Sequence, residues 1–165
     1  MECRIEVMKT GDWPQVAAIY QEGIETGLAT FQSEVPSWED WDRGHVACCR
    51  LVARKSDEVL GWAALSAVSS RSVYAGIGEV SVYVGTAYKK MGVGTALLNE
   101  LIRQSEANGF WMLQGVITKE NTASIVLHKK CGFRLVGIRE RIGRMPDGIW
   151  HDTVLLERRS RTIGI

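Results

Sequence analysis

A short loop with two lysines and two glycines is the first place in this sequence where residue types and spacing indicate chemistry. Residues 89–94 read Lys-Lys-Met-Gly-Val-Gly, between an alternating strand-like stretch and an amphipathic helical stretch. The start of a helix leaves four backbone N–H groups without intrahelical partners and carries a partial positive charge. Glycines let a ligand approach those donors closely. The loop therefore predicts a site for a phosphate-bearing ligand.

Two common phosphate-binding loops do not match this spacing. A P-loop has a Lys and then Ser or Thr directly after its last glycine, whereas Gly94 is followed by Thr95 and the lysines precede the glycines. The dinucleotide fingerprint places a third glycine where this chain has Leu97, and residues 112–114 offer no acidic partner for a ribose. The pattern therefore favours neither an ATP site nor a Rossmann site.

The loop instead resembles the (Gln or Arg)-x-x-Gly-x-(Gly or Ala) pyrophosphate loop of the GNAT acetyltransferase superfamily. Residues 121–133, Asn-Thr-Ala-Ser through Gly-Phe, resemble the Asn-x-x-Ala/Ser helix of the same superfamily. Lys89 replaces the usual Gln or Arg, which keeps a donor but loses the fork geometry of Arg. The resemblance implies acetyl-CoA as co-substrate, no metal, and a cofactor site made of Val82, Tyr83, Val84, Lys89, Lys90, Met91, Gly92, Val93, Gly94, Thr95, Asn121, Ser124 and Lys130.

Within that superfamily the chain is similar to the phosphinothricin and methionine sulfoximine N-acetyltransferases. The similarity lies in residues 24–26 with 30–31, in Arg71 with Tyr74, in residues 79–84 and in residues 150–152. It implies a homodimer that acetylates the α-amine of a small amino-acid analogue, of the phosphinothricin, methionine sulfoximine, methionine sulfone or arsinothricin type, in antibiotic or herbicide resistance. The substrate-binding residues that it implies are Phe31, Ser70, Arg71, Tyr74, Glu79 and Ser81.

Arg71 is the informative residue for the acceptor. Its guanidinium can hold a carboxylate or phosphinate through two parallel hydrogen bonds, or it can form an ordinary surface salt bridge. Phe31 and Trp62 are candidates for the pocket walls, although aromatic residues on strands more often belong to the core.

Glu79 is the candidate catalytic base. Attack of an amine on a thioester needs a neutral amine and a route for its proton. Period-two alternation places Glu79, Ser81 and Tyr83 on one face of a strand and three valines on the other, so the polar set can face a cleft. The resemblance implies that Glu79 takes the proton through a water and that the backbone of Val82 and Val84 pairs with the pantetheine arm. The alternative is an exposed strand carboxylate.

Three histidines have different expectations. We expect His45 at the surface. His128 occupies a helix position where many members of the superfamily place a general-acid tyrosine, so it either protonates the departing thiolate or contacts the cofactor without proton transfer. We expect His151 to support the acceptor side of the site, beside Asp152 on the opposite strand face.

The sequence leaves alternatives open for Asn121, for the mechanism and for the function. Asn121 caps the following helix, contacts CoA, or both. A cysteine nucleophile is the competing mechanism, but no base adjoins Cys48 and Cys49, and Cys131 lies at a helix end. Alternative functions are acetylation of protein N-termini or polyamines, and CoA sensing without catalysis.

Composition narrows the partners. The chain has 165 residues with 20 basic and 19 acidic side chains, so charge gives no reason to expect nucleic-acid or membrane binding. The four cysteines show no CxxC pair or regular spacing, and no apolar run approaches membrane-spanning length. We expect one cytoplasmic domain over residues 1–165.

Periodicity and turn signals predict the elements that carry these residues. The expected fold is a mixed α/β GNAT fold with about four helices and a central, twisted, mostly antiparallel seven-stranded sheet that is splayed at its fourth and fifth strands. Strands are expected at 3–7, 51–54, 59–67, 78–84, 111–118, 133–141 and 150–156, and helices near 12–27, 36–41, 92–108 and 122–130. Asp12 and Gln15 resemble a capping pair at the start of the first helix.

Overall fold

The computed structural model describes residues 2–165, and its seven strands form one sheet in the order β1-β2-β3-β4-β5-β7-β6. Every neighbouring pair is antiparallel except β4 and β5, which are parallel. The strands are β1 (Arg4–Val7), β2 (Leu51–Lys55), β3 (Glu58–Ala67), β4 (Ile77–Val84), β5 (Met112–Thr118), β6 (Arg134–Arg144) and β7 (Trp150–Arg159). The predicted fold class and every predicted strand are confirmed.

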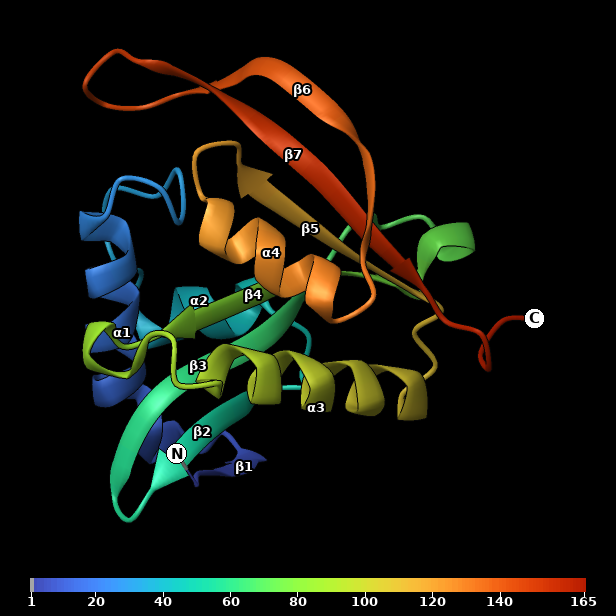
Figure 1. The fold of residues 1–165 in the computed structure, drawn as a ribbon. Coiled ribbons are helices and arrows are strands. Elements are labelled where there is room, and N and C mark those ends of the chain that lie inside the picture. Colours follow the sequence, from blue (N-terminus) through green and yellow to red (C-terminus); the bar gives the residue numbers. More distant parts are fainter. Residues whose placement is uncertain (1) are drawn as a thin grey trace.

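Four α-helices cover the two faces of the sheet, with α3 and α4 in front of it and α1 and α2 behind it in Figure 1. They are α1 (Trp13–Glu25), α2 (Trp38–Gly44), α3 (Val93–Ala107) and α4 (Thr122–Lys130). Short 3₁₀ turns lie at Thr10–Asp12, Ser72–Tyr74 and Thr86–Tyr88. No helix within residues 2–165 is long and apolar enough to cross a membrane.

The first helix begins differently from the capping pair expected of Asp12 and Gln15. Asp12 makes no side-chain cap to α1, and its carboxylate instead binds the Arg54 guanidinium at 2.6 Å. The Gln15 side chain accepts a hydrogen bond from the Val59 backbone N–H at 2.8 Å. Both side chains therefore tie α1 to the β2–β3 hairpin, because long-range partners compete with the local cap.

The sheet separates two apolar clusters. One lies under α3 and contains Leu97, Leu98 and Leu101, and the other lies under α1 and α2 and contains Val16 and Trp41. Trp62 is 0 % exposed in the second cluster and stacks on Tyr83 with ring centroids 4.7 Å apart. Of the two interpretations of Trp62, the core one is therefore confirmed and the pocket wall is not, because burial of its large ring in the core is more favourable.

His45 also belongs to this aromatic region and not to the surface. It is half-buried, its Nδ1–H donates to the Trp41 carbonyl at 2.7 Å, and its ring stacks on Trp41 at 4.1 Å. Burial lowers the pKa of His45. The surface expectation for His45 was wrong because the end of α2 folds the ring back onto the helix.

The expected splay of the sheet is confirmed by the register. β4 and β5 pair only where Ile77, Gly78 and Glu79 face Met112, Leu113 and Gln114. β4 continues to Val84 and β5 to Thr118 without further pairing, while β5 stays paired with β7 through Thr118. A wedge therefore opens between two parallel strands, and backbone groups of β4 on that side have no strand partner.

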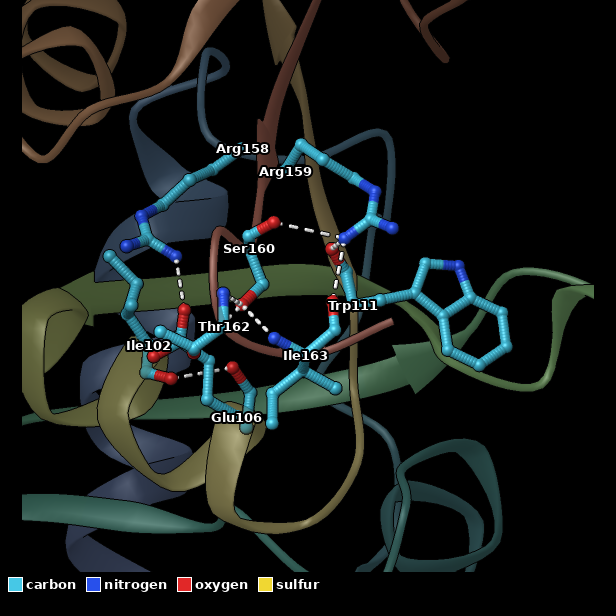
Figure 2. A network of polar contacts seen from close by, with 9 residues as sticks. Ile102, Glu106, Trp111, Arg158, Arg159, Ser160, Thr162 and Ile163 are labelled. Carbon is cyan, nitrogen blue, oxygen red and sulfur yellow. Dashed lines mark hydrogen bonds and ion pairs between the residues drawn. The ribbon is translucent and has the colours of Figure 1, made fainter. Parts of the chain in front are cut away.

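A polar network fixes the end of the chain, as Figure 2 shows. The Arg159 guanidinium donates to the carbonyls of Trp111 and Ile163 at 3.1 and 2.8 Å, and buried Ser160 accepts from the Thr162 and Ile163 N–H groups. Arg158 pairs with Glu106 of α3 at 3.0 Å and lowers the pKa of that carboxyl. These contacts attach β7 to α3 and to the start of β5.

Replacing Ser160 with Ala removes the acceptor for two backbone N–H groups of the terminal turn. We expect the free energy of unfolding to fall by about 1 kcal/mol, the usual net value of such hydrogen bonds. Urea denaturation measures the change, with Ser33→Ala as the control because Ser33 is exposed. Equal stability of the two variants would contradict the assignment.

Candidate active site

The wedge between β4 and β5 opens into a cleft of about 820 Å³. Its walls come from β4 (79–84), the end of β5 (116–118), the loop and helix start at 88–90 and 92–95, α4 with its N-cap (Asn121, Ala123, Ser124, Leu127 and His128), Thr153 of β7, and Gly23, Thr26 and residues 28–32 in and after α1. Of the residues expected in the site, Phe31, Glu79, Ser81, Val82, Tyr83, Val84, Lys89, Lys90, Gly92, Val93, Gly94, Thr95, Asn121, Ser124 and His128 line this cleft. Met91, Lys130, Ser70, Arg71, Tyr74 and His151 lie outside its lining.

The glycine loop places the unpaired backbone N–H groups at the start of α3 in the cleft wall. Gly92 is the N-cap of α3 with φ of 84°, a left-handed value that favours glycine, and its cap lacks a side-chain acceptor in the described chain. The first helical bond runs from the Ala96 N–H to the Gly92 carbonyl. The backbone N–H groups of residues 93–95 therefore have no intrahelical hydrogen bond. They line the cleft together with Lys89 and Lys90.

Gly94 lets α3 begin close to its neighbours. A Cβ atom at Gly94 would come within 3.1 Å of Leu127 Cδ2 and 3.5 Å of Val84 Cγ2. The start of α3 is thus packed between the end of β4 and the face of α4. This close approach explains the second glycine of the loop by packing as well as by ligand access.

A second helix start faces the same cleft. The Asn121 side chain caps α4 by accepting a hydrogen bond from the Ser124 N–H at 3.2 Å, and both residues line the cleft. Figure 1 shows α3 and α4 beginning on the same side, beyond the ends of β4 and β5. Two positive helix ends therefore converge on one opening, an arrangement suited to a ligand with several phosphates.

Glu79 sits where the two strands separate. It pairs in register with Gln114 of β5, and the Gln114 side-chain amide donates to Glu79 Oε1 at 2.9 Å. Glu79 is half-buried, and its second carboxylate oxygen has no hydrogen bond from residues 2–165. The carboxylate is thus held by one oxygen at the edge of the cleft. Local sequence patterns do not identify Gln114, because its role depends on the register of a parallel pair.

Tyr83 lies on the Glu79 face of β4, as the alternation predicts, and it packs in the α1-side core as well as lining the cleft. Its ring lies in the stack with Tyr20 and Trp62, and its hydroxyl donates to the Ala29 carbonyl at 3.4 Å. Burial raises the pKa of Tyr83. The side chain therefore fixes the segment after α1, while Val80, Val82 and Val84 pack against the α3-side core.

His128 is a buried wall of the cleft, 4 % exposed. Its Nδ1 lies 2.8 Å from the Ser124 carbonyl, and because a carbonyl only accepts, Nδ1 carries the hydrogen. Nε2 has no hydrogen-bond partner within the described chain and would lie 3.1 Å from a Cβ at Gly115. Burial lowers the pKa of His128, which favours the neutral ring with an accepting Nε2.

His151 lies behind the segment that carries Phe31. The two rings meet edge to face at 6.4 Å, and the Phe31 ring lies against Gly143, where any Cβ would come within 2.4 Å of it. His151 Nδ1 is 3.5 Å from Glu120 Oε2. Asp152 points to the other strand face, as expected, and accepts from the Arg141 N–H at 2.8 Å, which lowers the pKa of Asp152.

The expected acceptor loop is exposed. Arg71 lies over the Tyr74 ring at 5.4 Å, in the connection between β3 and β4, and Ser70 beside it is also exposed. The structure of this chain does not bring these side chains to the cleft lining.

Comparison with known proteins agrees with this geometry. Residues 13–133 match the family described as Acetyltransferase (GNAT) family. The chain is 35 % identical over 164 residues to phosphinothricin N-acetyltransferase of Alcaligenes faecalis, covering 94 % of this chain and 82 % of that protein. It is 27 % identical to the L-methionine sulfoximine/L-methionine sulfone acetyltransferase of Pseudomonas aeruginosa, covering 95 % and 94 %.

Two solved structures show the same fold. A GNAT superfamily phosphinothricin acetyltransferase from Sinorhizobium meliloti, in complex with AcCoA, has a TM-score of 0.85 at 27 % identity and covers 99 % of this chain and 96 % of that one. The ribosomal-protein-alanine N-acetyltransferase from Brucella melitensis has a TM-score of 0.86 at 27 % identity, covering 95 % and 99 %. The chain therefore belongs to the GNAT acetyltransferase family, in its phosphinothricin acetyltransferase-like branch, and is an acetyl-CoA-dependent N-acetyltransferase.

Proposed function

We propose that this enzyme transfers acetyl from acetyl-CoA to the α-amine of a small amino-acid analogue of the phosphinothricin, methionine sulfoximine, methionine sulfone or arsinothricin type. The amine attacks the thioester directly, with Glu79 as general base acting through a water. The observation that carries the proposal is the position of Glu79, held by Gln114 where the sheet opens, at the edge of a cleft that also receives two helix N-termini.

The cofactor is proposed to occupy the wedge. The N–H groups of residues 92–95, with Lys89 and Lys90, are suited to its pyrophosphate, and Asn121 and Ser124 border the same opening. Val82 and Val84 lie in the part of β4 that has left β5, so their backbone groups are available to an extended amide ligand as a strand edge would be.

His128 is proposed to contact the cofactor without transferring a proton. An Nδ1–H that donates to the Ser124 carbonyl leaves Nε2 as an acceptor, and the lowered pKa opposes the charged form that could donate. This favours the second of the two interpretations made from the sequence. His151 is proposed to support the acceptor side through its edge contact with Phe31.

A homodimer is proposed to complete the acceptor pocket. β6 is an edge strand, and large apolar side chains are exposed along it and on the start of β7, among them Leu135, Ile138, Ile142 and Trp150. Such a surface is typical of an interaction site. Arg71 lies outside the cleft of its own chain, so its proposed role in binding the acceptor carboxylate requires the assembled pocket.

A protein N-terminus is the second candidate acceptor. It is favoured by the structural similarity to a ribosomal-protein-alanine N-acetyltransferase, whose TM-score equals that of the phosphinothricin relative within 0.01. Release of CoA thiol in the presence of methionine sulfone, phosphinothricin or an alanine-terminated peptide distinguishes the two acceptor classes.

Replacing Glu79 with Gln keeps an acceptor for the Gln114 amide but removes the base. We expect kcat with the preferred acceptor to fall about 10²- to 10⁴-fold, the usual contribution of a positioned base. The Kd for CoA, measured by calorimetry, is expected to stay within about twofold of the wild-type value, because the phosphate contacts are untouched. Glu39→Gln is the control, since Glu39 is an exposed carboxylate of α2. If Glu79→Gln keeps more than about a third of the control's kcat, the base assignment is wrong.

Replacing Gly92 with Ala forces a side chain into a left-handed backbone conformation, at a cost of about 1–2 kcal/mol. Relief of that strain turns the helix donors away from the cleft, so the Kd for CoA is expected to rise about tenfold. Calorimetric titration with CoA measures the effect. Gly11→Ala is the matched control because Gly11 has open space around it and no left-handed φ. Equal Kd values for the two variants would show that this loop does not hold the cofactor.

A further inference from the structure

Two threonines lie opposite each other on the face of the sheet that carries Glu79. Thr118 of β5 and Thr153 of β7 are register partners. Alternation places them on the same face as Gln114, and therefore on the same face as its hydrogen-bonded partner Glu79. The opposite face carries Ile117 and Val154 of the α3-side core. Both threonines line the cleft.

The Thr153 hydroxyl is buried without a partner. Thr153 is 1 % exposed, and its Oγ1 makes no hydrogen bond to any residue from 2 to 165. Thr118 is 8 % exposed. A buried hydroxyl that stays unpaired loses its hydration without compensation, so such groups are retained where something else pairs with them. Thr153 lines the cleft, so a ligand bound there can supply the missing partner.

The pair has the geometry of a two-donor site. Directly opposed residues of an antiparallel ladder have Cβ atoms about 4.5–5.5 Å apart, so both hydroxyls can donate to oxygens of one group. His151, two residues before Thr153 on the same face, holds Phe31 at the cleft from behind. The hydroxyls are therefore flanked by an apolar ring that suits the methylenes of a side chain.

The distance from Glu79 sets the length of the ligand. At about 3.3 Å per residue, Thr118 lies roughly 13 Å along β5 from Gln114. An acceptor whose amine meets Glu79 through a water thus needs an extended side chain to reach the threonines. Hydrogen bonds of about 2.8 Å each, from Glu79 to the water, from the water to the amine and from the threonines to the tip oxygen, span roughly 8 Å of this distance. A side chain of methionine length that ends in oxygen can span the remainder.

We propose that Thr118 and Thr153 determine acceptor specificity by donating hydrogen bonds to an oxygen at the tip of the acceptor side chain, of the phosphinate, sulfone or sulfoximine class. This inference rests on the proposed function, because it assumes that the amine of the same acceptor is directed to Glu79.

The test compares methionine sulfone with norleucine, which has a similar length and no side-chain oxygen. For Thr153→Val and Thr118→Val, kcat/KM for the sulfone is expected to fall about 10- to 100-fold, mainly through KM, while the value for norleucine stays within about twofold. Thr153→Ser keeps the hydroxyl and is therefore expected to keep the preference for the sulfone. Thr10→Val, on an exposed turn, is the control.

Thermal unfolding separates recognition from a structural role. Val has the shape of Thr, and removing an unpaired buried hydroxyl should leave the Tm of Thr153→Val unchanged or higher. A marked drop in Tm would mean that the hydroxyl serves the fold, and would overturn the proposal. So would an unchanged preference for the sulfone in both Val variants.

Binding distinguishes this inference from the function on which it rests. Methionine sulfone is titrated calorimetrically into the CoA complexes of wild type and Thr153→Val. Weaker binding to the variant without any turnover by the wild type would refute the proposed function and keep the threonine site. Normal turnover with equal binding to both proteins would keep the function and refute the threonine site.

Discussion

The early end of the β4–β5 pairing is the constraint on which the site depends. Strands continue to pair wherever backbone groups would otherwise lose their partners. Here a parallel pair stops after Glu79 and Gln114, and both strands run on apart. The opening exposes backbone donors and acceptors of β4, provides the cleft, and brings the starts of α3 and α4 to its far end. An extended amide ligand with terminal phosphates complements each of these features.

The same opening separates two chemical environments. On the face of α3 and α4, glycines, lysines and helix N-termini provide for negative charge. On the face of α1 lie Glu79, Ser81 and the two threonines, which are proposed to contact the acceptor, and the segment after α1 lines the same cleft. Tyr83 secures that segment through Ala29 while its ring belongs to the core. In the proposed mechanism the two substrates therefore approach the point of reaction from opposite faces of one sheet.

Local sequence patterns predicted the elements and the glycine loop well, because both depend on short-range periodicity and on the backbone freedom of residues such as Gly92. They did not predict which side chains meet across the sheet. Gln114 and Thr153 acquire their positions from strand order and register, which no local window contains. For Trp62 the sequence left both a pocket wall and the core open, since an aromatic residue on a two-sided sheet can face either environment, and the structure places it in the core. Gln15 looked like a helix cap but binds a distant hairpin.

A crystal structure of the protein with CoA and methionine sulfone tests the central claim most directly. The thiol-bearing arm is predicted to lie between β4 and β5 with main-chain hydrogen bonds to Val82 and Val84, and the acceptor amine to lie on the α1 side, within one water of Glu79. A cofactor arm outside the wedge, or an acceptor amine that no water can connect to Glu79, would contradict the proposed active site.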